Sequence, residues 1–211
     1  MSTGEGGRAV MTGTASVPYA TDGTDFRGAL KYHYEVALRR FARFGLPCAV
    51  LFGQMYLWPM EHRGYVLPVA LVGLLGLVFT SILCYARVSL IRSCSRVFRT
   101  YPLVFRGPLE KVTLESRKLH IRLGLGEQAH PSMTMLAKDP LGRPGWPGGM
   151  AEGVWFAGDD PFGGAAIVPG TGEVLFMQPR DWGSAAKERE SAGEDRVEQA
   201  KGAGLTKPVG R

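Results

Sequence analysis

The fold of this chain is decided by residues 65–86, which read YVLPVALVGLLGLVFTSILCYA. This run of 22 residues contains no charged side chain. A helix needs about 20 apolar residues to cross the hydrocarbon core of a bilayer, which is about 30 Å thick. The run therefore predicts a transmembrane helix.

A second apolar run, residues 45–60, precedes it after a separation of only four residues. This run has 16 residues, and it extends further back if Arg43 reaches up to the lipid headgroups. Pro47 suits an early position in such a helix. The two runs together predict a transmembrane helical hairpin.

Small residues recur every four positions in both runs, and such rows let helix backbones approach closely. They indicate either packing of the two helices on each other or contact between two copies of the chain in a homodimer. The rows are Gly45, Ala49 and Gly53 in the first run, and Gly76, Thr80 and Cys84 in the second.

Basic residues flank the hairpin on both sides. The segment before the hairpin has five bases and one acid, a net charge of +4, and the segment after it has four bases, again +4. The net charge of the whole chain is only +6, so the positive charge is concentrated at these flanks. Positive charge is retained on the cytoplasmic side, so we expect a multi-pass plasma-membrane protein with both termini cytoplasmic. The excess predicts contact with anionic lipid and not with nucleic acid. The membrane-surface residues are Arg39, Arg40, Arg43, Arg87, Arg92, Arg96 and Arg99.

Residues 26–44 alternate as an amphipathic helix whose apolar stripe includes Phe26, Leu30, Tyr34 and Phe41. Asp25 can cap its start. The helix either lies on the inner leaflet, or extends the first span, or covers the soluble domain. Residues 87–96 form a second basic juxtamembrane segment.

The two ends of the chain are polar. Residues 1–25 are rich in Gly, Thr and Ser, and residues 183–211 mix acids and bases with almost no large apolar side chain. We predict that both are disordered.

Between these parts, residues 97–182 predict a small cytoplasmic β domain, which makes the chain an α+β membrane protein. Residues 118–125 alternate between apolar and polar side chains, and clusters of Gly, Pro and Asp separate the later strands. Short strands at this spacing favour a small antiparallel β-barrel or roll. The predicted strands are 97–105, 109–115, 118–125, 133–137, 154–157, 165–168 and 173–178.

Two loops of this domain supply the candidate sites for binding a partner or a lipid. Residues 139–152 are dominated by Pro and Gly and include Arg143 and Trp146. Such a loop either presents Trp146 to a partner or headgroup, or connects strands while Trp146 packs on the barrel. The second loop carries Asp159, Asp160 and Phe162, and its acids either cap a turn or contribute to a metal site.

The sequence contains none of the common catalytic or metal-binding motifs: no GxSxG, no GxxxxGK[ST], no HExxH and no Cys/His pair at zinc spacing. We therefore expect no cofactor and no metal. One enzyme hypothesis stays open, a membrane-bound hydrolase that uses Asp159 or Asp160.

The layout also resembles known proteins. A basic segment, RVSLIRSCSRVFRTYPL, follows the two spans, and a β domain with GVWFAGDDPFGG closes at QPRDW. Over residues 30–182 this resembles two-span integral membrane proteins of actinobacteria, a family that implies no particular activity. It is also similar to bacterial membrane proteins with a pleckstrin-homology-like domain. Such a domain ends in an amphipathic helix, and the tail of this chain is too polar to predict one. A membrane-tethered OB-type barrel is a third architecture of this kind.

These observations favour a non-enzymatic protein whose cytoplasmic β domain is held against the membrane to bind a protein or a lipid headgroup. Apart from the hydrolase, the alternative is a small subunit that stabilises a larger membrane complex. The partners expected are the lipid bilayer and a protein or second copy of the chain.

Overall fold

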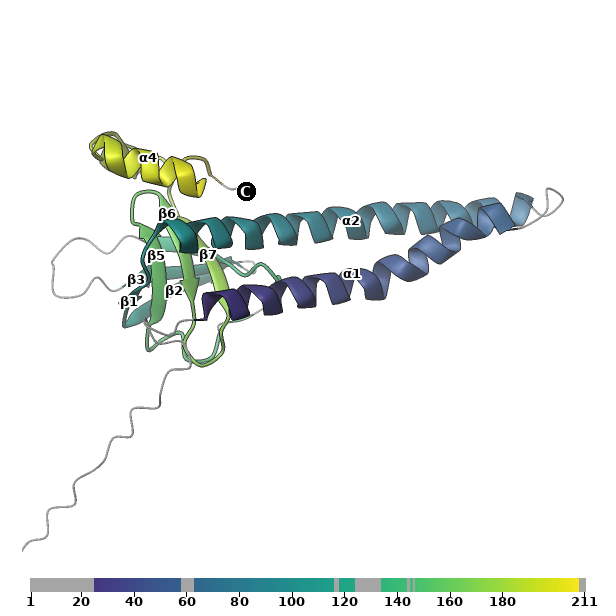
Figure 1. Ribbon diagram of the computed structural model, residues 1–211, viewed down its shortest axis with the longest axis horizontal. Coiled ribbons are helices and arrows are strands. Elements are labelled where there is room, and N and C mark those ends of the chain that lie inside the picture. Colours follow the sequence, from purple (N-terminus) through teal and green to yellow (C-terminus); the bar gives the residue numbers. More distant parts are fainter. Residues whose placement is uncertain are drawn as a thin grey trace, which may run out of the picture.

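The structure, a computed structural model, describes residues 25–57, 63–115, 118–123, 134–143, 145 and 147–208. Within these ranges, two long helices lead into a sheet, and two short helices close the chain (Figure 1). The elements are α1 (Phe26–Leu57), α2 (Arg63–Thr100), β1 (Val104–Arg106), β2 (Leu109–Glu115), β3 (Lys118–Leu123), β4 (Thr134–Lys138), β5 (Val154–Asp159), β6 (Gly163–Ile167), β7 (Val174–Pro179), α3 (Ala186–Glu190) and α4 (Glu194–Ala203).

Helices α1 and α2 lie side by side and extend well beyond the sheet (Figure 1). With 32 and 38 residues, they are about 48 Å and 57 Å long. Of the helices in the described ranges, α2 alone is long and apolar enough to cross a membrane, with a mean hydropathy of 2.5 over its most apolar window. Only 11% of that window is buried, which distinguishes α2 from the core helix of a soluble protein. The α+β class and one candidate span are therefore shown, whereas the two-span hairpin stays a prediction.

Residues 26–44 are the first part of α1 and not a separate helix. Asp25 caps its start as predicted, because the Asp25 carboxylate accepts a hydrogen bond from the amide of Gly28 at 2.7 Å. Pro47 lies inside α1, and its expected early position is wrong. A proline inside a helix removes one backbone hydrogen bond, and α1 bends midway along its length (Figure 1).

Residues 87–100 continue α2, so the predicted basic segment is helical. The predicted strand 97–105 is wrong for its first seven residues, because 97–100 belong to α2 and 101–103 connect it to β1. The buried side chains Ile91, Cys94, Phe98 and Tyr101 recur at steps of three and four, which is the helical period. The short apolar run VFRTYPLVF concealed this period, and strand structure begins only at Val104. The other six predicted strands match β2 to β7 with ends shifted by up to two residues.

The described strands form one antiparallel sheet of seven strands in the order β1-β5-β6-β7-β4-β3-β2. The order is that of an open sheet, because β1 and β2 stand at its two ends. The closed barrel is therefore not shown. A flat sheet of this size would separate its outer strands by about 29 Å, whereas the link from Arg106 to Leu109 spans at most about 11 Å. The sheet must consequently curl until its two ends approach each other.

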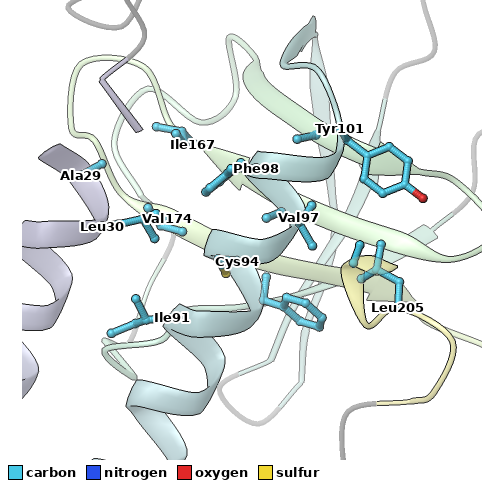
Figure 2. Packing of buried hydrophobic residues seen from close by; sticks show 14 of the residues in the cluster. Ala29, Leu30, Ile91, Cys94, Val97, Phe98, Tyr101, Ile167, Val174 and Leu205 are labelled. Atoms are coloured by element: carbon cyan, nitrogen blue, oxygen red, sulfur yellow. The ribbon is translucent and has the colours of Figure 1, made fainter. Parts of the chain in front are cut away.

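The curled sheet buries one face on itself and the other on the helices. Its inner cluster draws on β2 to β7 and includes Ile121, Met135, Phe156, Leu175 and Met177. The outer face of β6 and β7 meets α1 and α2 through Ile167 and Val174 in a second cluster (Figure 2). As a result β6 and β7 are buried on both faces.

The tail was expected to be disordered, but residues 186–205 of it are folded and include α3 and α4. Three small or medium side chains, Ala200, Ala203 and Leu205, are fully buried in the outer cluster. Figure 2 shows Leu205 beside α2. Gly204 ends α4 in a left-handed conformation with φ of 76°, and the amide of Leu205 donates to the carbonyl of Ala200 at 2.9 Å. Composition misled the prediction, because this narrow stripe of alanines needs no large apolar residue.

Candidate functional site

A groove of about 800 Å³ lies between the amino-terminal half of α1 and the carboxyl-terminal half of α2. We call it the interhelical groove. Its floor is apolar, and its rim carries three bases and one acid. The floor is formed mainly by Phe26, Leu30, Tyr34, Leu38 and Val88, and the charged rim by Arg27, Lys31, Glu35 and Arg99.

The four rim charges are exposed, and two of them, Lys31 and Glu35, pair with each other. Lys31 and Glu35 form an ion pair at 4.0 Å whose side chains are 79% and 54% exposed, so the pair contributes little to stability. Arg27 and Arg99 are exposed as well, at the end of the groove nearest the sheet. The groove therefore combines an apolar surface with a net positive edge.

The predicted membrane-surface arginines differ in their exposure to solvent. Arg39, Arg43, Arg92, Arg96 and Arg99 are exposed, and Arg87 is half-buried. Arg40 instead donates a hydrogen bond to the carbonyl of Leu141 at 2.7 Å. Arg40 thus ties α1 to the loop after β4 and serves the junction between helix and sheet.

That junction is a cluster of polar side chains, which we call the anchor cluster: His33, Arg40, Asp139, Arg143 and Glu173. Arg143 bridges two loops of the sheet, since its Nε lies 3.0 Å from Asp139 Oδ2 and its Nη1 lies 2.7 Å from Glu173 Oε1. The sequence predicted Arg143 as a contact for a partner, whereas the structure gives it two acidic partners of its own. Trp146 lies outside the described residues.

His33 is the fully buried member of the anchor cluster. Its Nδ1 donates to the carbonyl of Ala29 at 2.8 Å, and its Nε2 accepts from the amide of Val174 at 3.4 Å. Both contacts suit the neutral ring with its proton on Nδ1. Burial lowers the pKa of His33 below its ordinary value of 6.5.

The two candidate carboxylates point to different partners. Asp159 accepts two hydrogen bonds from Arg196 of α4, at 2.6 Å and 3.0 Å. Asp160 pairs with Arg106 of β1 at 2.5 Å. They therefore fasten the tail and the edge strand to the β5–β6 turn and do not converge on one ligand, and Phe162 between the strands is buried.

No cluster of three or more His, Cys, Asp or Glu side chains with metal-binding geometry occurs in the part of the chain that the structure describes. Among the cysteines, Cys94 is buried in the outer cluster, and burial raises the pKa of its thiol. Burial also raises the pKa of Tyr101 to about 12. Groups in these states do not ionise near neutral pH.

Only some of the small residues in the two predicted rows lie at the contact between α1 and α2. A side chain on Gly76 would meet Cys48 Sγ, whereas one on Gly53 would meet nothing within 4 Å. Gly45 faces Phe41 of its own helix. The Thr80 hydroxyl donates to carbonyls of its own helix, to Gly76 at 2.9 Å. Ala49 is half-buried.

Among the glycines of the two helices, Gly73 lies tightest against the backbone of the other helix, and the sequence did not single it out. A Cβ there would lie 2.6 Å from the backbone nitrogen of Phe52 and 2.8 Å from the carbonyl oxygen of Cys48. The missed signal is the spacing of Gly73 and Gly76 three residues apart, because both then face the same side of α2.

No family model, no curated protein and no solved structure matches this chain. The resemblance to two-span actinobacterial proteins and to pleckstrin-homology-like membrane proteins therefore stays a prediction. The function has to be inferred from the geometry of the chain itself.

Proposed function

We propose that this chain is a plasma-membrane protein with spans at residues 45–60 and 65–86 and with both termini in the cytoplasm. Its sheet domain is a non-enzymatic binding module for a protein or a lipid, held next to the inner surface of the bilayer. The observation that carries this proposal is the continuity of α1 and α2 from an exposed apolar region into the core of the sheet domain.

Exposed apolar side chains support the placement of the spans. On α2 they extend from Leu67 to Tyr85, a length of about 27 Å, and on α1 from Phe44 to Leu57, about 20 Å. The length on α2 matches the hydrocarbon core of a bilayer. Water would make so long an apolar surface costly, at about 25 cal/mol for each Å² exposed, whereas lipid would not.

The basic flanks support the orientation. Arg39 and Arg43 on α1, and Arg92 and Arg96 on α2, are exposed beside the end of the apolar region that leads to the sheet. Retention of such residues in the cytoplasm puts the sheet domain there as well.

Rigid attachment supports the role as a binding module. The anchor cluster joins α1 to both loops at one end of the sheet, and α2 buries Ile91, Cys94 and Val97 in the core. The domain therefore keeps one orientation relative to the helices. Confinement next to a membrane raises its effective concentration toward anything else bound there, so a weak contact suffices.

Cysteine accessibility tests the placement. Gly64→Cys lies at the far end of the helix pair, and Ser184→Cys lies on the exposed surface of the domain. We expect a membrane-impermeant maleimide to label intact cells at position 64 only, and position 184 only after permeabilisation. The parent chain is the control, because Cys94 is buried and Cys48 and Cys84 lie in the apolar region. Recovery of the chain in the soluble fraction after lysis would overturn the proposal.

Chemical crosslinking in native membranes tests the binding role, combined with mass spectrometry of the purified full chain to detect retained lipid. We expect a reproducible crosslinked protein or a tightly bound lipid. A chain that yields neither, although folded and inserted, would contradict a binding module.

A further inference from the structure

We infer that the interhelical groove is the docking site for an amphipathic helix with acidic flanks, supplied by a partner protein. This inference rests on the proposed function and names the partner that the module binds. Leu30 on the floor belongs to the outer cluster, and Phe26 and Tyr34 pack against that cluster with part of their surface. Leu38 is 65% exposed and contributes no core contact, so the fold of the sheet domain does not account for this part of the floor.

The floor of the groove has the form of a helix-packing surface. Phe26, Leu30, Tyr34 and Leu38 succeed one another every four residues along α1, which is the ridge that interdigitates with a neighbouring helix. On α2 the lining side chains Cys84, Val88 and Ser95 are short, which makes room for the larger side chains of a third helix. The groove runs about 18 Å along α1 and 22 Å along α2, so it takes a helix of about 12 to 15 residues.

The rim determines the charge of that helix. Arg27, Lys31 and Arg99 give three positive charges, against Glu35, which is the one acid of the lining and already lies near Lys31. A helix that fills the groove brings its flanks within reach of Arg27 on one side and Arg99 on the other. Acidic flanks are complementary to this edge, and basic flanks are repelled by it.

The distance from the bilayer favours a helix over a lipid. Arg99 follows the last apolar residue of the span, Ala86, by 13 positions, which is about 20 Å along α2. The headgroup layer of a bilayer is only about 5 to 8 Å thick on each side. A lipid that keeps its chains in the bilayer cannot bring its phosphate to Arg99 or Arg27, and the apolar floor near Phe26 does not suit a headgroup.

A designed peptide tests the inference. The probe is a fluorescent helix of about 15 residues, with leucines at every third and fourth position and glutamates on both flanks. It is titrated into the full chain in nanodiscs of phosphatidylcholine. Two matched peptides are the controls, one with the same composition in scrambled order and one with lysine in place of glutamate. We expect the acidic amphipathic peptide alone to bind.

Two double variants test the rim. Arg27→Gln with Arg99→Gln removes two charges from the groove, and we expect it to weaken binding about fivefold. Lys187→Gln with Lys201→Gln removes two exposed charges from α3 and α4, and we expect no change. Equal binding by the two variants, or equal binding of the scrambled or lysine peptide, would overturn the inference.

A photocrosslinker separates a peptide from a lipid in native membranes. Tyr34 on the floor, or Tyr32 as an exposed control on the same helix, is replaced by p-benzoylphenylalanine. We expect a crosslink to an acidic helical peptide from Tyr34 only, and loss of this crosslink in the Arg27→Gln and Arg99→Gln variant. A phospholipid adduct at Tyr34 would overturn the inference. If the peptide fails while the cysteines at positions 64 and 184 are labelled as expected, the groove inference fails and the proposed function stands.

Discussion

Replacement of Gly73 should separate α1 from α2 more than replacement of any other glycine of the pair. A Cβ at this position would lie 2.6 Å from the nitrogen of Phe52, 2.8 Å from the oxygen of Cys48 and 2.9 Å from Cβ of Leu51. Two of these atoms are backbone, so no rotamer change relieves the clash. Ordinary contact at about 3.4 Å or more requires the helices to move apart by nearly 1 Å.

The magnitude follows from two opposing terms. Overpacking of a well-packed contact costs about 1 to 3 kcal/mol, and replacing glycine by alanine in a helix returns up to about 1 kcal/mol. We therefore expect Gly73→Ala to lower the free energy of unfolding by about 1 to 2 kcal/mol. Gly76→Ala should cost less, because its nearest neighbour is the Cys48 side chain, which can rotate.

Gly53→Ala is the matched control. A Cβ there meets nothing within 4 Å, so only the helix-propensity term remains and the variant should be as stable as the parent or slightly more stable. Unfolding of the full chain in mixed micelles, titrated with SDS and followed by circular dichroism, measures the series. A larger loss for Gly53→Ala than for Gly73→Ala would refute the described helix contact and place the packing face where the sequence row had put it.

Three further predictions concern the sheet domain. Acidification should destabilise it through His33, because the lowered pKa means that the unfolded state binds the proton first: this stability is complete above pH 6.5 and is lost as the pH falls toward the lower folded pKa. Denaturant titrations from about pH 7.5 to about pH 5.5 should show that the free energy of unfolding falls by at most about 1.4 kcal/mol per pH unit through this group. His33→Gln should reduce this pH dependence, and an unchanged dependence in the variant would contradict the buried neutral ring. Arg196→Gln should cost about 0.5 to 1 kcal/mol, because the arginine is half exposed, and should speed amide exchange within α4 only, with Lys201→Gln as the control. Leu205→Ala should lower the free energy of unfolding by about 2 to 3 kcal/mol, because Leu205 is fully buried. Val197→Ala, on the exposed side of α4, is the control and should change it little. Equal and negligible effects on denaturant unfolding would mean that the tail is disordered.

Local patterns in the sequence were sufficient to predict most strands. The alternation within residues 118–125 and the turn residues before Gly163 and Val174 mark β3, β6 and β7 to within two residues. These signals are local, because a strand half buried on a sheet alternates by itself. They failed at residues 97–100, where a helix and a strand both accommodate a short apolar run.

The order of the strands and the contacts at the candidate sites were not predictable in this way. Asp159 and Arg196 are 37 residues apart in the chain, and Asp160 and Arg106 are 54 apart. Whether a carboxylate is free or paired depends on such distant partners. The local sequence of a turn with two acids therefore does not distinguish a free pair of acids from one that forms ion pairs. One side of the interhelical groove was predictable, because its α1 floor belongs to the apolar stripe of residues 26–44. The other side was not, because the sequence did not indicate that α2 continues to Thr100.

The unbroken course of α2 makes the position of the sheet domain depend on the thickness of the bilayer. The apolar stretch of residues 65–86 is about 33 Å long, so in a hydrocarbon layer of 30 Å it is matched at a tilt of about 25°, and in a layer of 27 Å at about 35°. The 14 residues from Arg87 to Thr100 form a lever of about 21 Å, and a change of 10° moves its end by about 4 Å. With α2 across the membrane as proposed, local thinning of the lipid swings the domain sideways by roughly one strand spacing.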